Sequence, residues 1–169
     1  MLEPSNTLIL KRNNQHGIVF IKQNLDGYSS YIEFKVNIEK KYKSLTQLFI
    51  GLVDKSKYKI GQLSSKYWRD SPSSFYWNVW EKQLSKTDEY GIQINCSKGY
   101  GCSCEDCETF LGMKYDHISR SINFFKNGIN LGVAFRNVPS GLTPSLELWF
   151  EVGSVEIIQN ASCEEKIFL

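Results

Sequence analysis

The sequence predicts an all-β fold, a sandwich of two antiparallel sheets, and three observations lead to this prediction. Apolar residues recur with a period of two along several segments. Turn-forming residues such as Asp26-Gly27 and Asn127-Gly128 separate those segments. No long window fits a helical stripe better than it fits strict alternation. With 169 residues, the chain suits a single domain that spans 1–169 and buries a sizeable core.

The clearest strand is the segment Tyr31–Ile38. Its apolar side chains at Ile32, Phe34, Val36 and Ile38 fall on one face, and the other face is expected to be partly exposed to solvent. The same alternation, less regular, predicts further strands at Thr7–Leu10, Gly17–Lys22, Ser121–Phe125, Ser145–Phe150 and Val155–Gln159. A short helical turn is considered only for Ile38–Leu48.

One hairpin is predicted together with its register. Asn127-Gly128 supplies the two positive-φ positions of a type I′ turn between two apolar segments. Uninterrupted pairing from this tip predicts these opposed residues: Lys126 and Ile129, Phe125 and Asn130, Phe124 and Leu131, Asn123 and Gly132, and Ile122 and Val133. The apolar pairs then share one face, as a half-buried pair of strands requires.

Charge and hydropathy exclude several classes of partner. Twenty basic against 18 acidic side chains give a net charge of +2, without the basic excess typical of nucleic-acid domains. No apolar run approaches the length of a membrane span. Glu3 and Pro4 stand where a secretory signal has its basic and apolar regions. We therefore expect no nucleic-acid or membrane partner, and an intracellular location, cytoplasmic or nuclear.

The hairpin and its flanks resemble a known family, the SPRY domain. The resemblance rests on Ser121–Gly128, continuing through Leu131–Phe135 and Val138-Pro139 to Leu142 and Pro144. Further pieces match in the family's order: Tyr31–Val36, Phe49–Val53, Leu111–Asp116 and Gly153–Ile157. Together they cover about 27–159, which leaves short N- and C-terminal extensions. The spacing from Pro144 to Gly153 is most similar to the Ran-binding protein M type.

The resemblance implies a bent, concanavalin-like sandwich that binds a short segment of a partner protein through loops at one rim. It implies no catalysis and no cofactor. Members often serve as substrate-recognition or scaffold parts of ubiquitin ligases and other regulatory assemblies. We expect the domain to be monomeric. Two segments depart from the family pattern, Ser74–Glu81 and Gly101–Glu108, and both are expected to be loops.

Aromatic side chains near predicted loops are the first candidates for partner contacts. Trp149 is opposite in phase to Leu146, Leu148 and Phe150, so it points outward if those three point into the core. We take Trp149 and Phe150 as one candidate pair. The second pair, Tyr67 and Trp68, is flanked by charges before a Ser-Pro turn. An exposed aromatic is a good binding anchor, although either pair can also pack locally.

Polar residues after two predicted strands are the second group of candidates. Arg12, Asn13 and Asn14 follow the first strand, where adaptor members of the resembled family contact a short polar motif. Asp54 directly follows the apolar segment that ends at Val53, so its carboxylate is placed to accept peptide amides. A solvated turn is the alternative interpretation for each.

Four of the five cysteines form a cluster: Cys96, Cys102, Cys104 and Cys107. Cys104 and Cys107 have the spacing of a zinc knuckle, but the other two are too irregularly spaced for a typical structural site. We therefore predict no metal site and free thiols in a loop, and keep two alternatives open. The first is a zinc-stabilised interaction domain that uses these four residues, and the second is a redox-reactive or crosslinked cluster.

Two other function classes remain as alternatives. A Cys107–His117 nucleophile pair would make the protein an enzyme, but no oxyanion-forming or phosphate-binding motif accompanies it. We therefore predict that the protein is not an enzyme. A lectin-like sandwich would bind glycans through an exposed tryptophan, although no Asp/Asn cluster for Ca²⁺ stands out.

Overall fold

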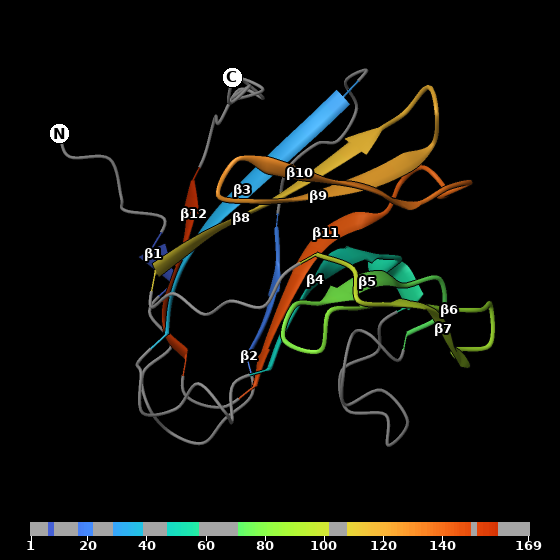
Figure 1. The fold of residues 1–169 in the computed structure, drawn as a ribbon. Helices are drawn as coiled ribbons and strands as arrows, with labels where there is room; N and C mark the ends of the chain where they lie inside the picture. Colours follow the sequence, from blue (N-terminus) through green and yellow to red (C-terminus); the bar gives the residue numbers. More distant parts are fainter. Residues whose placement is uncertain are drawn as a thin grey trace, which may run out of the picture.

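The computed structural model describes residues 7–8, 17–21, 29–38, 47–57, 71–101, 108–149 and 152–158. In this part of the chain two antiparallel sheets lie face to face (Figure 1). The one helical element described is a single turn, η2 (Lys55–Lys57). None of the described helices is long and apolar enough to cross a membrane. The predicted all-β sandwich is confirmed.

Each sheet contains six described strands, and the chain crosses between the sheets several times. In the order of hydrogen-bonded neighbours, sheet A consists of β1 (Thr7–Leu8), β12 (Val152–Ile158), β3 (Ser29–Ile38), β8 (Glu108–Asp116), β9 (Ser121–Lys126) and β10 (Ile129–Phe135). Sheet B consists of β2 (Gly17–Phe20), β11 (Thr143–Trp149), β4 (Gln47–Val53), β5 (Phe75–Asn78), β6 (Gln83–Thr87) and β7 (Gln93–Lys98).

The alternation that predicts β3 is reproduced in its burial. Ile32, Phe34 and Val36 are buried, and the residues between them are half-buried. These three side chains face the core because β3 lies between β12 and β8, where one face of the sheet is covered by sheet B. The segments predicted near Thr7, Gly17, Ser121, Ser145 and Val155 are strands as well. The helical turn considered for Ile38–Leu48 falls mostly outside the described residues.

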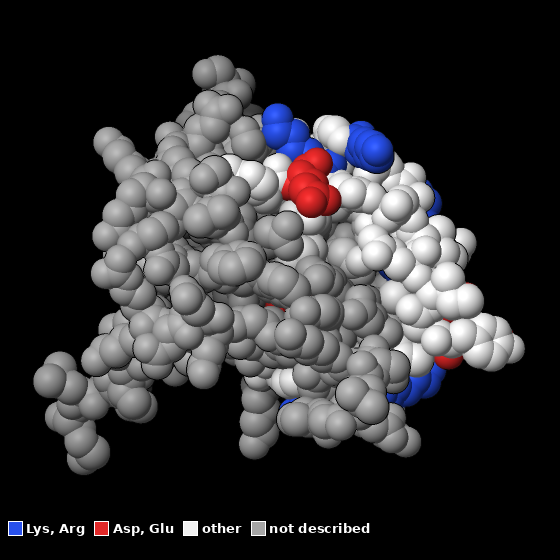
Figure 2. Space-filling view, turned by 90° about the horizontal axis from the view of Figure 1, so that it is seen from below, with Lys and Arg blue, Asp and Glu red and all other residues white. Residues whose placement is uncertain are grey.

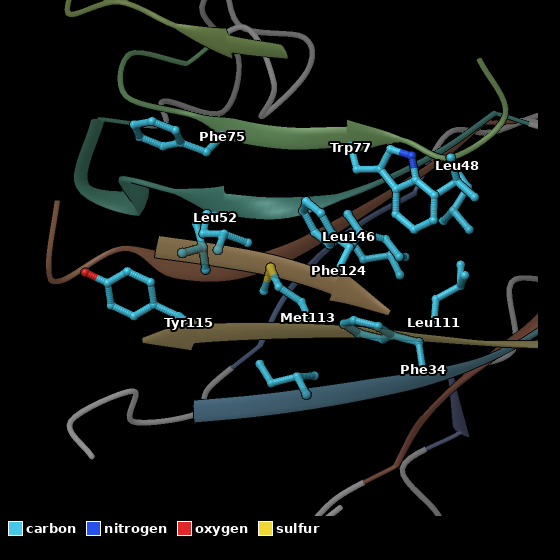
Figure 3. Packing of buried hydrophobic residues seen from close by; sticks show 14 of the residues in the cluster. Phe34, Leu48, Leu52, Phe75, Trp77, Leu111, Met113, Tyr115, Phe124 and Leu146 are labelled. Atoms are coloured by element: carbon cyan, nitrogen blue, oxygen red, sulfur yellow. The ribbon is translucent and has the colours of Figure 1, made fainter. Parts of the chain in front are cut away.

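The core fills the space between the sheets with large apolar side chains from both (Figure 3). Trp77 of β5 is fully buried and its ring lies 5.5 Å from that of Phe124 of β9. Near the other end of the core, the rings of Phe75 and Phe135 meet edge to face at 5.6 Å. Each such side chain contributes roughly 1.5–3 kcal/mol by leaving water, so these contacts hold the two sheets together.

The prediction of a loop at Ser74–Glu81 is wrong for Phe75–Asn78, and the residues that follow are a turn. Phe75–Asn78 forms β5, all four of its residues are buried, and it pairs with both β4 and β6. Gly51 allows β4 and β5 to approach closely, since a Cβ there would lie 2.8 Å from Cα of Tyr76. Two further strands, β6 and β7, were not predicted, because neither shows a clean apolar alternation.

The predicted hairpin register holds only near the turn. Lys126 opposes Ile129 and Phe125 opposes Asn130, as expected. Beyond that point Asn123 opposes Val133 and Ile122 opposes Phe135, because β10 carries extra residues at two register shifts. Val133, expected on the buried face, is therefore exposed. Ile129, which keeps its predicted pairing, is exposed as well, so the face assigned to it is also wrong.

Candidate partner-binding rim

Three turns meet at the end of sheet B where β4 ends and β5 begins. We define the Asp54 rim as Asp54–Lys57, 71–74 and 88–92. Lys57 Nζ donates to Ser73 Oγ at 3.4 Å, and the backbone N–H of Ser73 donates to the Asp88 carbonyl at 3.1 Å. These bonds join segments that are far apart in the sequence, so the rim is one connected surface.

Asp54 organises the first turn through its own side chain. Its Oδ1 accepts hydrogen bonds from the backbone N–H and the hydroxyl of Ser56, and Oδ2 lies 3.5 Å from Lys57 Nζ. The hydrogen bonds to Ser56 and the charge of Lys57 lower the pKa of the Asp54 carboxyl. The carboxylate is therefore ionised at neutral pH and stabilises the start of η2. Its side chain is 26% exposed, so part of it remains accessible to a partner.

A buried hydroxyl holds the second turn against the end of β6. Thr87 Oγ1 donates to the Ser71 carbonyl and accepts the backbone N–H of Ser74 at 2.9 Å. The backbone N–H of Thr87 in turn donates to the Ser74 carbonyl at 2.9 Å. Because Thr87 and Ser74 are both buried, water competes little for these bonds. The segment 71–74 is therefore well fixed.

Asp88 organises the third turn and presents two apolar side chains to solvent. Its Oδ1 accepts the backbone N–H groups of Tyr90 and Ile92, both at 2.9 Å. Gly91 occupies the positive-φ position that the turn requires, at +82°. Tyr90 is 78% exposed and Ile92 is 63% exposed. Neither residue is among the contact residues predicted from the sequence. The available signal was a pair of turn-forming residues, Asp88 and Gly91, beside an aromatic residue.

Charge on the described surface is dispersed. The Nζ atom of Lys55 lies 5.3 Å from the centre of the Phe20 ring and makes a cation–π contact at the edge of the rim. On the face shown in Figure 2, most of the described surface is uncharged, and both blue and red side chains lie near its margin. A dispersed pattern of this kind suits a protein partner better than a polyanion.

The structure separates two of the residues predicted to bind a partner. Val53, which precedes Asp54, pairs with Thr143 at one end of β11, whereas Trp149 pairs with Gln47 at the other end. At about 3.4 Å per residue, these ends of the strand are about 20 Å apart. Asp54 and Trp149 therefore cannot line one small pocket, and a peptide would have to run along the strands to reach both.

Other predicted contact residues lie outside the described residues: Arg12, Asn13, Asn14, Tyr67, Trp68 and Phe150. The backbone of Trp149 is described as the last residue of β11, but its side chain is not. Glu147, on the same face of that strand, is fully buried, so the face is not open to solvent along its whole length. The partner-binding role of these residues stays a prediction.

The cysteine cluster is only partly described. Cys96 has the predicted free thiol and is exposed, but it lies in strand β7 and the predicted loop placement is wrong for it. Cys102, Cys104 and Cys107 lie outside the described residues. Local desolvation raises the pKa of the Cys96 thiol, so it is protonated at neutral pH. Among the described residues no group of three or more side chains could hold a metal ion. Because three of the four cysteines lie outside the described residues, the zinc alternative and the Cys107–His117 pair stay untested.

Comparison with known proteins agrees with the fold. The family model for the SPRY domain matches residues 31–160. The SPRY domain of human HERC1 is 14% identical, with a TM-score of 0.59 over 96% of this chain and 93% of that chain. Another human SPRY domain is 18% identical, with a TM-score of 0.64 over 95% of this chain and 96% of that chain.

The search of the curated proteins found no match. The comparisons do not support the narrower likeness to the Ran-binding protein M type. The family match covers more than three quarters of the sequence and includes β3 to β12, the strands that carry the core. SPRY domains are protein-interaction modules that are generally non-catalytic and typically need no cofactor. The chain belongs to the SPRY domain family.

Proposed function

We propose that this domain binds a short segment of a partner protein through its rim loops, and that the Asp54 rim is part of the binding surface. The observation that carries the proposal is the turn at Asp88, where Tyr90 and Ile92 are mostly exposed although they are apolar. Two adjacent exposed apolar side chains on a hydrogen-bonded turn are typical of an interaction site.

The rim supports binding through its rigidity as well as its composition. Hydrogen bonds accepted by the Asp54 and Asp88 carboxylates and donated by the Thr87 hydroxyl fix all three turns before a partner arrives. A pre-ordered surface loses little conformational entropy on binding, so more of the contact energy appears as affinity. Tyr90 would supply the apolar anchor, and the partly accessible Asp54 carboxylate would orient the peptide backbone.

The remaining predicted contact residues are included in this proposal. Arg12, Asn13, Asn14, Tyr67 and Trp68 would extend the surface, and Trp149 with Phe150 would contact a more distant part of the partner. We further propose that the domain acts as a monomer and serves as a substrate-recognition or scaffold part of a ubiquitin ligase or another regulatory assembly. Family membership and the absence of a marked net charge support this role.

Affinity capture followed by mass spectrometry tests the proposal. The double variant Tyr90→Ala with Ile92→Ser should lose most captured partners, because it removes both apolar anchors. Its melting temperature should stay close to wild type, since neither side chain packs in the core. Ile129→Ser is the matched control, because Ile129 is 56% exposed but lies on the β9–β10 hairpin. Equal capture by the double variant and by wild type would show that the rim is not the site.

A further inference from the structure

Strand β7 forms an edge of sheet B that is open to solvent. Among the described strands it has β6 as its only neighbour. All six of its residues are exposed. An exposed edge strand presents unpaired backbone donors and acceptors, and proteins usually cover or interrupt such an edge.

The pairing with β6 shows which backbone groups of β7 are not bonded to that strand. The N–H of Asp88 donates to the Ile92 carbonyl at 3.1 Å, and Lys86 is opposite Ile94 in the same register. In an antiparallel ladder, hydrogen-bonded pairs alternate with pairs that are not bonded to each other. The N–H and C=O groups of Gln93 and Asn95 therefore point away from β6, toward the open edge.

The edge carries exposed apolar side chains and a charged residue toward each of its ends. Tyr90, Ile92 and Ile94 are exposed at alternate positions, by 78%, 63% and 42%. Exposed Glu89 lies in the turn that precedes the strand, and exposed Lys98 is the last residue at the other end. The edge therefore offers a short ladder, an apolar row and opposite charges at its two ends.

We propose that β7 accepts an extended segment of a partner protein as an added antiparallel strand. The segment would carry apolar residues at alternate positions, an acidic residue at its N-terminal end to meet Lys98, and a basic residue at its C-terminal end to meet Glu89. Antiparallel addition is favoured because such pairs outnumber parallel ones. The inference rests on the proposed function, in that the partner is a segment of another protein.

The size of the edge favours a peptide over a second copy of this chain. A register shift at Cys96 interrupts β7, so its first three residues share one register with β6 and Ser97 and Lys98 pair in a shifted one. The longest uninterrupted stretch of the edge is therefore short. Such a short contact is well below the roughly 1,200–2,000 Å² that stable protein–protein interfaces bury. The other exposed edge of comparable length, β10, has two register shifts within seven residues and is a poorer template.

Titration of the ¹⁵N-labelled protein with a probe peptide, Glu-Thr-Val-Thr-Ile-Thr-Lys blocked at both ends, tests the proposal. The amide resonances of Gln93 and Asn95 should shift most, and a probe with the terminal charges exchanged should bind more weakly. Gln93→Pro should weaken binding about fivefold relative to Gln93→Ala, because both variants lose the side chain but only proline loses the outward N–H. Ile94→Thr, which keeps the strand backbone, should also weaken binding while the melting temperature stays unchanged.

Two outcomes would overturn the inference. Equal binding of the probe to Gln93→Pro and Gln93→Ala, both folded, would show that the edge does not pair with it. Self-association of the wild type in sedimentation, lost in Gln93→Pro, would make a second copy the occupant. Partner capture separates this inference from the proposed rim: if only the Tyr90 and Ile92 variant loses partners, the rim stands and the edge pairing fails. If only Gln93→Pro loses partners, the edge pairing stands and the rim fails.

Discussion

Tyr100 connects the two sheets at the end of the core opposite the Asp54 rim. Its hydroxyl donates to the Gly132 carbonyl of β10 at 2.7 Å and accepts the Phe124 N–H at 3.4 Å. Its ring meets that of Trp77 edge to face at 5.9 Å. Burial disfavours the charged phenolate and raises the pKa of Tyr100 to about 12. Sequence reasoning could not select this tyrosine, because its partners are distant in the sequence.

This raised pKa predicts a loss of stability in alkaline solution. In the unfolded chain Tyr100 ionises near the usual tyrosine pKa of 10.0, whereas in the folded protein it stays protonated until about 12. Unfolding therefore releases a proton between these values, so the free energy of unfolding falls as the pH rises through this window. Below the window the contribution of Tyr100 is fully present and does not vary with pH. In urea unfolding at several pH values, Tyr100→Phe should show a shallower decline above pH 10 than wild type. An identical decline in both proteins would contradict the assignment.

At the scale of elements, the β9–β10 hairpin shows what local sequence determines. The turn forms at Asn127-Gly128 as predicted, with φ values of +49° and +78°. The two register shifts beyond it were not predictable from periodicity. The hydroxyl of Tyr100, distant in the sequence, binds the Gly132 carbonyl, and Asn130 Oδ1 accepts the Gly132 N–H locally at 2.9 Å. Gly132 itself takes a φ of +92°, which a longer side chain would resist.

The hairpin turn is also fastened to β8, and this gives a prediction. Asn127 Oδ1 accepts the Phe110 N–H at 2.9 Å, and the Asn127 N–H donates to the Phe110 carbonyl at 2.8 Å. Asn127→Ala should destabilise the protein by about 2 kcal/mol, from a lost hydrogen bond and a strained positive φ. Asn127→Gly loses only the hydrogen bond and should cost about 1 kcal/mol. Urea unfolding of both variants measures the difference, and equal losses would contradict this account.

At the scale of the whole molecule, the sheets join distant parts of the chain. β11 lies between β2 and β4, and β12 lies between β1 and β3, so strands from the end of the chain complete both sheets. The core is therefore closed only after the last strands are in place. The pairing partners of each strand could not be predicted from periodicity, since alternation identifies a face but not a neighbour.

This topology predicts the effect of removing the last two strands. A chain that ends at residue 140 lacks β11 and β12 and leaves β4 and β3 each without a neighbour on one side. Leu146 and Val155, both buried, would also be missing from the core. We expect no near-ultraviolet circular dichroism signal and no cooperative thermal transition, in contrast to the full chain. A cooperative transition in the shortened chain would show that the sheets are less interdependent than the topology implies.

The sequence by itself determined the all-β class, the inward face of β3, the turn at Asn127-Gly128 and the family, because these depend on local periodicity, backbone preference and short motifs. Only the tertiary structure decided that β5 is a buried strand, that β10 is twice bulged, and that Asp54 and Trp149 lie at opposite ends of sheet B. It also revealed the Asp54 rim and the open edge of β7. These features arise from which strands are neighbours, and neighbours are chosen by long-range packing that no local pattern encodes.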